Sequence, residues 1–321
     1  MSVRTFRRST VVGIALVATA ALSLSACGSD SDDASSGASP SASSTEIAIT
    51  KDATLAALVP ASLAPGGTIE VGTDASYAPN EYVDGGKIVG LDIDLGNAIG
   101  EVLGVKMKFT NSPFDAIIPG IQSGKYGLGI SSFTANAERQ KVVNFATYFN
   151  AGTQWAVQKG NPQGVSIDDA CGKKVAVQKG TVQVDDIKAR SKQCTDGGKE
   201  AIEISQYQLQ SDASNAVASG KDDAMLADSP ITAYAVKTAP GLELLGDIYD
   251  AAPYGIAMPC NADGKACATP YTSQPTDNVN LTKAIQGAVQ KLIDGGQYQQ
   301  ILDKWGAGSG AIKTSEINPA K

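Results

Sequence analysis

The chain of 321 residues contains no histidine, and this absence excludes several kinds of chemistry. Ser-His-Asp and Cys-His catalysis both need an imidazole, and so do zinc sites with histidine ligands. The side chain that most often serves as a general base near neutral pH is missing as well. An acid–base enzyme would instead need a positioned carboxylate, for which Asp74 and Glu81 are the early candidates.

Nucleotide-binding motifs and a basic surface are also missing. The sequence has no P-loop, and the glycine-rich "GAGSG" at Gly306–Gly310 follows no predicted strand, so it is not a dinucleotide fingerprint. The formal net charge is -7, and without the first 26 residues, which hold three arginines and no acid, it falls to about -10. Because nucleic-acid binding needs a basic face, we exclude nucleic acid as a partner.

The N-terminus has the pattern of an export signal. Arg4, Arg7 and Arg8 precede the apolar run Val11–Ala26, which ends in small residues. This run is short and rich in alanine for a membrane span, so we predict a signal peptide over residues 1–26, with an uncleaved anchor as the alternative. The next residue completes "LSAC" (Leu24–Cys27), which resembles the lipobox of bacterial lipoproteins. That resemblance implies that Cys27 carries lipid such as palmitate and becomes the mature N-terminus.

The segment that follows is poor in residues that could form a core. Residues 28–45 include eight serines and no aromatic or branched aliphatic residue. Such a segment cannot bury enough surface to order itself, so we predict a flexible, lipid-anchored linker over residues 27–50.

Four of the five cysteines remain once Cys27 is assigned to lipid: Cys171, Cys194, Cys260 and Cys267. An exported protein meets an oxidising compartment, so we predict two disulfides. Four cysteines allow three pairings, and proximity in the sequence favours Cys171–Cys194 and Cys260–Cys267. A metal site is the alternative, but the spacings do not resemble CxxC, and we predict no metal.

Short β-type runs and helical stripes alternate from about Thr68 onward, and the alternation restarts after Gly160. The first unit places strands at 68–72, 105–109 and 128–132, with helices between them. In the second unit we expect strands at 173–180, 201–207, 222–228, 242–249 and 254–259, and the chain closes with helical stripes. This alternation predicts two α/β units with mainly parallel sheets.

Polar residues gather where four of these strands end. The segments are "VGTDASYAPNEY" (Val71–Tyr82), "ISSFTANAER" (Ile130–Arg139), "VQKGTVQ" (Val177–Gln183) and "LADSP" (Leu226–Pro230). In open α/β sheets, ligands bind at the carboxyl ends of strands. Turn chemistry could explain any one cluster alone, but not the convergence of four.

The residue types in these clusters suit a zwitterion. The planar fork of Arg139 matches a carboxylate, unless it only forms a surface salt bridge. Backbone amides at the helix starts near Thr134 and Thr181 can add donors, and Gly180 permits close approach. Asp228 and the hydroxyls of Ser132 and Thr134 can accept from an ammonium group.

Seven stretches of the chain together resemble the family 3 solute-binding proteins of ABC importers, of the type that binds polar amino acids. They are "VGTDASYAP", "IVGLDIDLGNAI", "FDAIIPGIQSGK", "ISSFTANAERQKVVNFATYF", "KKVAVQKGTVQ", "AMLADSP" and "YGIAM". They span about Thr68 to Trp305 in the order and spacing of the family.

The resemblance implies an α/β, two-lobe periplasmic-binding-protein-like fold of type II, with two crossover strands as a hinge. We expect one lobe at residues 51–152 and 253–321, the other at 153–252, and the crossovers near Asn150–Ala156 and Tyr249–Gly255. It also implies a function, which is to carry an amino acid to a membrane permease and its ATPase, without a cofactor and without catalysis. We expect a monomer held by its lipid at the outer face of the cell membrane. A sensory lipoprotein and a dehydratase-like enzyme on the same fold are the alternatives.

The resemblance further implies a set of ligand-binding residues. Arg139 would bind the ligand carboxylate with the backbone of Thr134 and Thr181, and Ser132, Thr134 and Asp228 would hold the α-ammonium group. The full predicted set is Asp74, Tyr77, Asn80, Phe114, Ser131, Ser132, Phe133, Thr134, Arg139, Gly180, Thr181 and Asp228.

Asp74 decides the predicted ligand. With Arg139 and Asp228 engaged by the zwitterion, this carboxylate is left over, which favours a cationic or amide side chain. Many relatives carry an aromatic residue where Asn80 follows Pro79, and a polar Asn80 fits the same preference. We therefore expect a basic amino acid or glutamine rather than glutamate or an aliphatic amino acid.

Overall fold

The computed structural model describes residues 47–261 and 266–320, and these residues belong to one compact unit. The predicted signal peptide, the lipidated Cys27 and most of the predicted linker lie outside the described residues. Across the part of the chain that is described, no helix has both the length and the apolar character needed to cross a bilayer.

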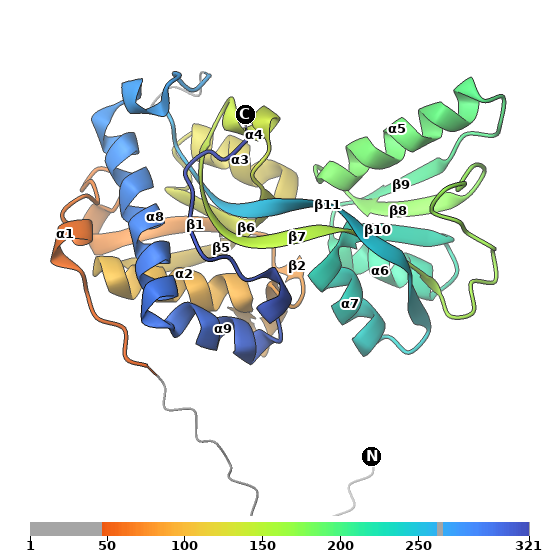
Figure 1. Ribbon diagram of the computed structural model, residues 1–321, viewed down its shortest axis with the longest axis horizontal. Helices are drawn as coiled ribbons and strands as arrows, with labels where there is room; N and C mark the ends of the chain where they lie inside the picture. Colours follow the sequence, from red (N-terminus) through yellow and green to blue (C-terminus); the bar gives the residue numbers. More distant parts are fainter. Residues whose placement is uncertain (1–46, 262–265, 321) are drawn as a thin grey trace, which may run out of the picture. The chain divides into compact units, whose positions relative to one another are not determined.

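A single sheet of eight strands, in the order β5-β1-β6-β11-β7-β10-β8-β9, forms the centre of this unit (Figure 1). On one side, β1 (Thr68–Thr73) pairs in parallel with β5 (Lys106–Asn111) and β6 (Leu128–Thr134). On the other side, β8 (Lys174–Gln178) pairs in parallel with β9 (Glu203–Tyr207) and β10 (Ala224–Asp228). The predicted α/β architecture is confirmed.

Two long strands join the two sides of the sheet. β7 (Asn144–Gln158) and β11 (Leu242–Met258) pair antiparallel from end to end and contact β6 and β10, one on each flank (Figure 1). The sequence predicted two separate strands where β11 is one. Its register shifts at three places around the residues that separated them, and Asp250 there has a φ of 48°.

The elements on the β5-β1-β6 side make up what we call the first lobe. Its main helices are α2 (Leu91–Leu103), α3 (Phe114–Gln122), α8 (Thr276–Gly295) and α9 (Gln297–Trp305). α2 buries Leu91, Leu95 and Ile99 at helical spacing and ends at Gly104 in the left-handed conformation. These side chains share a core with Leu281, Ile285 and others from α8.

The smaller elements of the first lobe complete the list. They are α1 (Ala53–Ala56), α4 (Ala137–Gln140), the 3-10 turns η1 (Pro65–Gly67), η2 (Tyr271–Ser273) and η3 (Gly308–Gly310), and a second sheet of β2 (Ser76–Tyr77), β3 (Glu81–Asp84) and β4 (Lys87–Val89). This second sheet was not predicted from the sequence, because its strands hold only two to four residues and show little alternation.

The second lobe comprises β8, β9 and β10 with α5 (Val182–Asp196), α6 (Gln210–Ala218) and α7 (Ser229–Thr238). It has a core of its own in which Trp155, Val177 and Ile187 are fully buried. A separate core in each lobe lets each one keep its own packing while β7 and β11 connect them.

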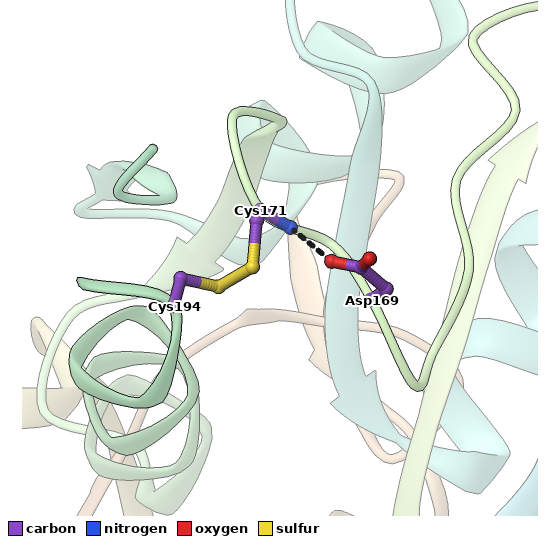
Figure 2. Close-up of side chains that lie close together, drawn as sticks. All are labelled: Asp169, Cys171 and Cys194. Atoms are coloured by element: carbon purple, nitrogen blue, oxygen red, sulfur yellow. Dashed lines mark hydrogen bonds between the residues drawn. A yellow bond between two sulfur atoms is a disulfide. The ribbon is translucent and has the colours of Figure 1, made fainter. Parts of the chain in front are cut away.

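Both predicted disulfides are confirmed. Cys171 pairs with Cys194 and Cys260 pairs with Cys267. Asp169 lies beside the first disulfide, where its carboxylate accepts a hydrogen bond of 3.4 Å from the Cys171 amide (Figure 2). The three side chains are close enough to surround an ion, but the two sulfurs are bonded to each other, whereas a metal would need free thiolates.

The two disulfides should contribute unequally to stability. Their cysteines are 23 and 7 residues apart. Closing the longer loop removes more freedom from the unfolded chain, so Cys171→Ser with Cys194→Ser should cost about 3 kcal/mol and the other pair about 1 kcal/mol less. Urea unfolding followed by tryptophan fluorescence measures both losses. A larger loss for the Cys260–Cys267 pair would contradict the loop-closure explanation.

Candidate functional site

The four predicted strand-end clusters meet where the two lobes face each other. Asp74 directly follows β1, and Asp228 and Gln178 are the last residues of β10 and β8. Three pairs of residues form hydrogen bonds that join these ends across the lobes. They run from Tyr77 Oη to Asp228 Oδ2 at 2.8 Å, from Gln178 Nε2 to Asp74 Oδ2 at 2.7 Å, and from Arg139 Nη2 to the Gly180 carbonyl at 3.1 Å.

Asp228 is a buried carboxylate at the start of α7. One oxygen accepts from Tyr77, and the other accepts from Gln183 Nε2 at 2.8 Å. Burial raises the pKa of Asp228, while the nearby hydroxyl of Tyr254, the hydrogen bonds from Tyr77 and Gln183, and the charge of Arg139 oppose the rise. A carboxylate has about four acceptor positions, so Asp228 keeps capacity for a further donor such as an ammonium group.

Asp74 is also buried, and its acceptor positions are already taken. Ser76 donates to Oδ1 through its amide and hydroxyl, at 3.1 and 2.7 Å, while the Phe114 amide and Gln178 donate to Oδ2. The Phe114 amide begins α3, so the carboxylate also meets the positive end of that helix. Burial raises the pKa of Asp74, and the hydrogen bonds oppose that rise.

Arg139 lies on α4, half-buried beside two aromatic rings. Phe114 and Phe133 stack with their centroids 4.7 Å apart, and the guanidinium carbon lies 5.4 and 5.5 Å from them. Its Nη1 donates to the Thr134 carbonyl at 3.0 Å. Desolvation lowers the pKa of Arg139 to about 10, so the group stays charged at neutral pH. Its hydrogen bonds go to neutral carbonyls, which leaves its charge available to a ligand anion.

Gly180 and Thr181 belong to the second lobe, and the Gly180 carbonyl accepts from Arg139. Gly180 has a φ of 82°, and a Cβ at this position would lie 2.8 Å from the Asp115 Cβ. Both conditions require glycine. Thr181 is the N-cap of α5, as predicted for a helix start, and its hydroxyl donates to the Gln178 carbonyl at 2.7 Å. The other predicted start lies slightly later than Thr134, because α4 begins at Ala137 after an Asn136 cap.

Ser131, Ser132 and Asn80 face into the first lobe. Ser131 Oγ accepts from the Asp74 amide at 3.0 Å and donates to Glu81. Ser132 has a φ of 52°, and its Oγ accepts from Asn80 Nδ2 at 2.8 Å. Their hydroxyls therefore hold the pocket wall together, a role that the sequence analysis did not anticipate.

The structure thus brings Asp74, Tyr77, Phe114, Phe133, Arg139, Gly180, Thr181 and Asp228 to one place, and ties Asn80, Ser131 and Ser132 to the wall behind it. Gln178 and Gln183, which bond to the two site carboxylates, were not predicted from the sequence, and neither was Asp92 behind Ser132. Glu81 was considered only as a candidate for acid–base catalysis, whereas here it accepts from Ser131. The two glutamines lie within the "VQKGTVQ" cluster, so their place at a strand end could be predicted from the sequence. Their partners lie in distant segments and could not be predicted.

The charges of this site do not balance. Among the site residues that the structure describes, the buried carboxyl groups of Asp74 and Asp228 outnumber the one arginine, Arg139, whose charge acts on Asp228. A ligand that brings a carboxylate for Arg139 and a net positive charge would neutralise the arrangement.

Known proteins are similar to this chain in sequence and in fold. Residues 69–308 match the sequence profile of the bacterial extracellular solute-binding proteins, family 3. The arginine-binding protein ArgT of Corynebacterium glutamicum is 37% identical over 265 residues, which cover 82% of this chain and 82% of that protein.

Two similar solved structures are of an ancestral arginine-binding protein, one bound to arginine and one bound to glutamine. They are 35% and 34% identical in sequence, each with a TM-score of 0.65. The alignments cover 74% and 75% of this chain and 98% of each structure. Together with the profile match, these similarities confirm the expected two-lobe fold. The chain belongs to the family 3 bacterial extracellular solute-binding proteins.

Proposed function

We propose that this protein is the extracytoplasmic substrate-binding component of an ABC importer and that it holds a basic amino acid, with arginine favoured, between its two lobes. The observation that carries the proposal is that the described residues of the site include one arginine, Arg139 beside Phe114 and Phe133, and two buried carboxyl groups, Asp74 and Asp228. This combination suits an amino acid whose side chain is also positive.

The backbone part of the ligand has a matching partner at each end. Arg139 would turn its fork from the carbonyls of Thr134 and Gly180 toward the ligand carboxylate, which is a stronger, charge-assisted acceptor. The α-ammonium group would use the remaining acceptor capacity of Asp228. Tyr77 and Gln183 already hold that carboxylate in place from two directions.

The ligand side chain would reach Asp74. Because four protein donors already fill this carboxylate, one of them has to give way. Gln178 is the donor that reaches Asp74 from the second lobe. A guanidinium group offers five N–H donors and a full charge, so it can replace the neutral amide at a gain. Glutamine can replace one amide by another without that gain in charge, so it is the weaker candidate.

Closure of the lobes follows from where these contacts lie. We assign residues 51–152 and 253–321 to one lobe and 153–252 to the other, with β7 and β11 as the hinge strands. A ligand that touches Arg139 and Asp74 in one lobe and Asp228 in the other favours the closed state by its differential affinity. A membrane permease with its ATPase would then recognise the closed form and receive the amino acid.

The same proposal implies where the protein is located and in which oligomeric state it acts. Family members are extracellular, and the lipobox-like Leu24–Cys27 would hold this one at the membrane surface through lipid on Cys27. The protein would act as a monomer and catalyse no reaction. Mass spectrometry of the mature N-terminus in the membrane fraction would detect the lipid on Cys27.

Isothermal titration calorimetry across the common amino acids tests the ligand preference. We expect arginine to bind most tightly, lysine and glutamine more weakly, and glutamate and the aliphatic amino acids not at all. Glutamate would place a second anion beside Asp74, where no described cation faces it. Tight glutamate binding without binding of arginine, lysine or glutamine would contradict the assignment.

Arg139→Ala should abolish the thermal stabilisation that arginine confers without unfolding the protein. At a ligand concentration of 100 times Kd, binding stabilises the wild-type protein by about 2.7 kcal/mol, and this gain depends on the carboxylate contact. Differential scanning fluorimetry with and without arginine measures it.

Arg190→Ala is the matched control for that experiment. Arg190 also lies beside aromatic rings, 5.7 Å from Trp155 and 5.0 Å from Tyr249, but it pairs with Asp186 away from the site. Its loss should lower the melting temperature and preserve the response to arginine. An undiminished ligand response in Arg139→Ala would refute the carboxylate role.

Asp74→Asn should lower the affinity for arginine at least tenfold, about 1.4 kcal/mol, and reduce the affinity for glutamine much less, because the negative charge that it removes attracts a guanidinium group more strongly than a neutral amide. Asp115→Asn is the control. Asp115 forms an ion pair of 2.8 Å with Lys179 between the lobes, close to Gly180. Loss of this ion pair should lower the affinity for arginine and the affinity for glutamine by the same factor. If Asp74→Asn lowered the affinity for arginine and for glutamine equally, Asp74 would not be the partner of the ligand side chain.

A further inference from the structure

Two acidic side chains lie completely buried behind the ligand-facing end of β6. Glu81 on β3 and Asp92 on α2 are both 0% exposed. Ser132 touches both, since its hydroxyl lies 3.5 Å from Glu81 Oε2 and 3.3 Å from Asp92 Oδ2. One serine hydroxyl therefore lies within hydrogen-bonding distance of both carboxyl groups, and the charge of Asp92 helps to raise the pKa of Glu81.

No cation neutralises this pair among residues 47–261 and 266–320, since neither carboxyl group has a lysine or arginine within an ion pair there. The groups that face it are hydroxyls, amides and further acids. From β6 come Ser131 and Ser132, from β7 comes Tyr148, and Asp74 and Tyr77 lie close enough to act through their charge or polarity. Two ionised carboxylates in this setting would repel each other without compensation.

The hydrogen bonds divide the two groups into a donor and an acceptor. Asp92 Oδ2 accepts three of them, from the Ser132 amide at 2.8 Å, the Ser132 hydroxyl at 3.3 Å and Tyr148 Oη at 2.7 Å. Asp92 Oδ1 is buried and accepts no hydrogen bond from the described residues, so it is free to accept one from a protonated Glu81. Asp92 is thus arranged as the carboxylate and Glu81 as the acid that donates to it.

We propose that Glu81 and Asp92 share one proton in the folded protein and that this protonated pair positions Ser131 and Ser132 at the end of the ligand-binding strand. The proton sits on Glu81 and forms an O–H···O⁻ hydrogen bond to Asp92. The other oxygen of Glu81, Oε1, accepts from Ser131 at 2.8 Å.

The carboxyl pair can position the end of β6 because Ser131 and Ser132 bond both to the pair and to the site. Ser132 has a φ of 52°, a strained conformation for a residue other than glycine, and its amide is fixed by Asp92. Ser131 accepts from the Asp74 amide at 3.0 Å and thereby connects Glu81 to the site carboxylate. The link to ligand binding rests on the proposed function, whereas the shared proton does not.

The direction of the titration agrees with this geometry. Burial raises the pKa of Glu81 well above its usual value and raises the pKa of Asp92 to about 6. A carboxyl group whose pKa is higher in the folded state stabilises the protein most at low pH. That stability is lost as pH rises from the pKa of the unfolded chain toward the pKa of the folded pair.

Carboxyl ¹³C NMR of ligand-free, wild-type protein between pH 3 and 9 tests the proton directly. We expect the Glu81 carboxyl to keep its proton at pH values well above the usual pKa of a glutamate, which is about 4.3. The amide signal of Ser132 should move with the same midpoint, because that amide donates to Asp92. Titration of both carboxyl groups below about pH 5 would overturn the proposal.

Glu81→Gln provides the second test, because a glutamine amide can donate to Asp92 and accept from Ser131 without a titrating proton. In the wild-type protein this one proton should increase the unfolding constant about tenfold for each pH unit between the unfolded and folded pKa values. The variant should lose that component in urea unfolding measured from pH 5 to 8. Glu203→Gln, at an exposed position, should keep the wild-type slope, and an unchanged slope in Glu81→Gln would overturn the proposal.

A bound cation is the competing explanation for a buried acidic pair. If sodium, potassium or calcium chloride stabilises the wild-type protein much more than Glu81→Gln, the cluster binds that cation and the shared proton is wrong. Every readout uses the protein without amino acid. If Glu81 titrates like an ordinary glutamate, the shared proton is refuted but the proposed function is unaffected. If arginine does not bind, the proposed function is refuted but the shared proton is unaffected.

Discussion

The site depends on one constraint, which is that charge buried between two lobes has to be balanced. Asp74 and Asp228 are almost fully buried, and among the described residues Arg139 is the arginine of this site, with its charge acting on Asp228. Hydrogen bonds from Tyr77, Gln178 and Gln183 hold the carboxylates in place but do not cancel the excess negative charge. In the function we propose, the ligand balances this charge, as a molecule with one carboxylate and a net positive charge.

The fold turns this electrostatic requirement into a mechanical one. The first lobe contributes Arg139 and Asp74, and the second contributes Asp228 and Gly180, while β7 and β11 run through both. Each lobe has its own core, so movement between them needs no repacking inside either one. A ligand that completes the charge balance at the interface therefore acts on the relative position of the lobes.

The sequence predicted much of this, and its failures have a common physical origin. Arg139, Asp228 and the disulfides were accessible because local chemistry or spacing marks them. Gln178 was not singled out, because its partner Asp74 is 104 residues away and belongs to the other lobe. Asn80 was assigned to the side-chain pocket, while its amide bonds to Ser132 in the wall behind. The pairing of Glu81 with Asp92 likewise depends on how β3 packs against α2, which no periodicity reveals.

A crystal structure of the protein with arginine bound tests the central claim most directly. The account predicts that the ligand carboxylate lies against the Arg139 guanidinium, the α-ammonium group against Asp228, and the ligand guanidinium against Asp74, with Gln178 moved aside. Arginine bound in the opposite orientation, or bound without contact to Arg139, would contradict it.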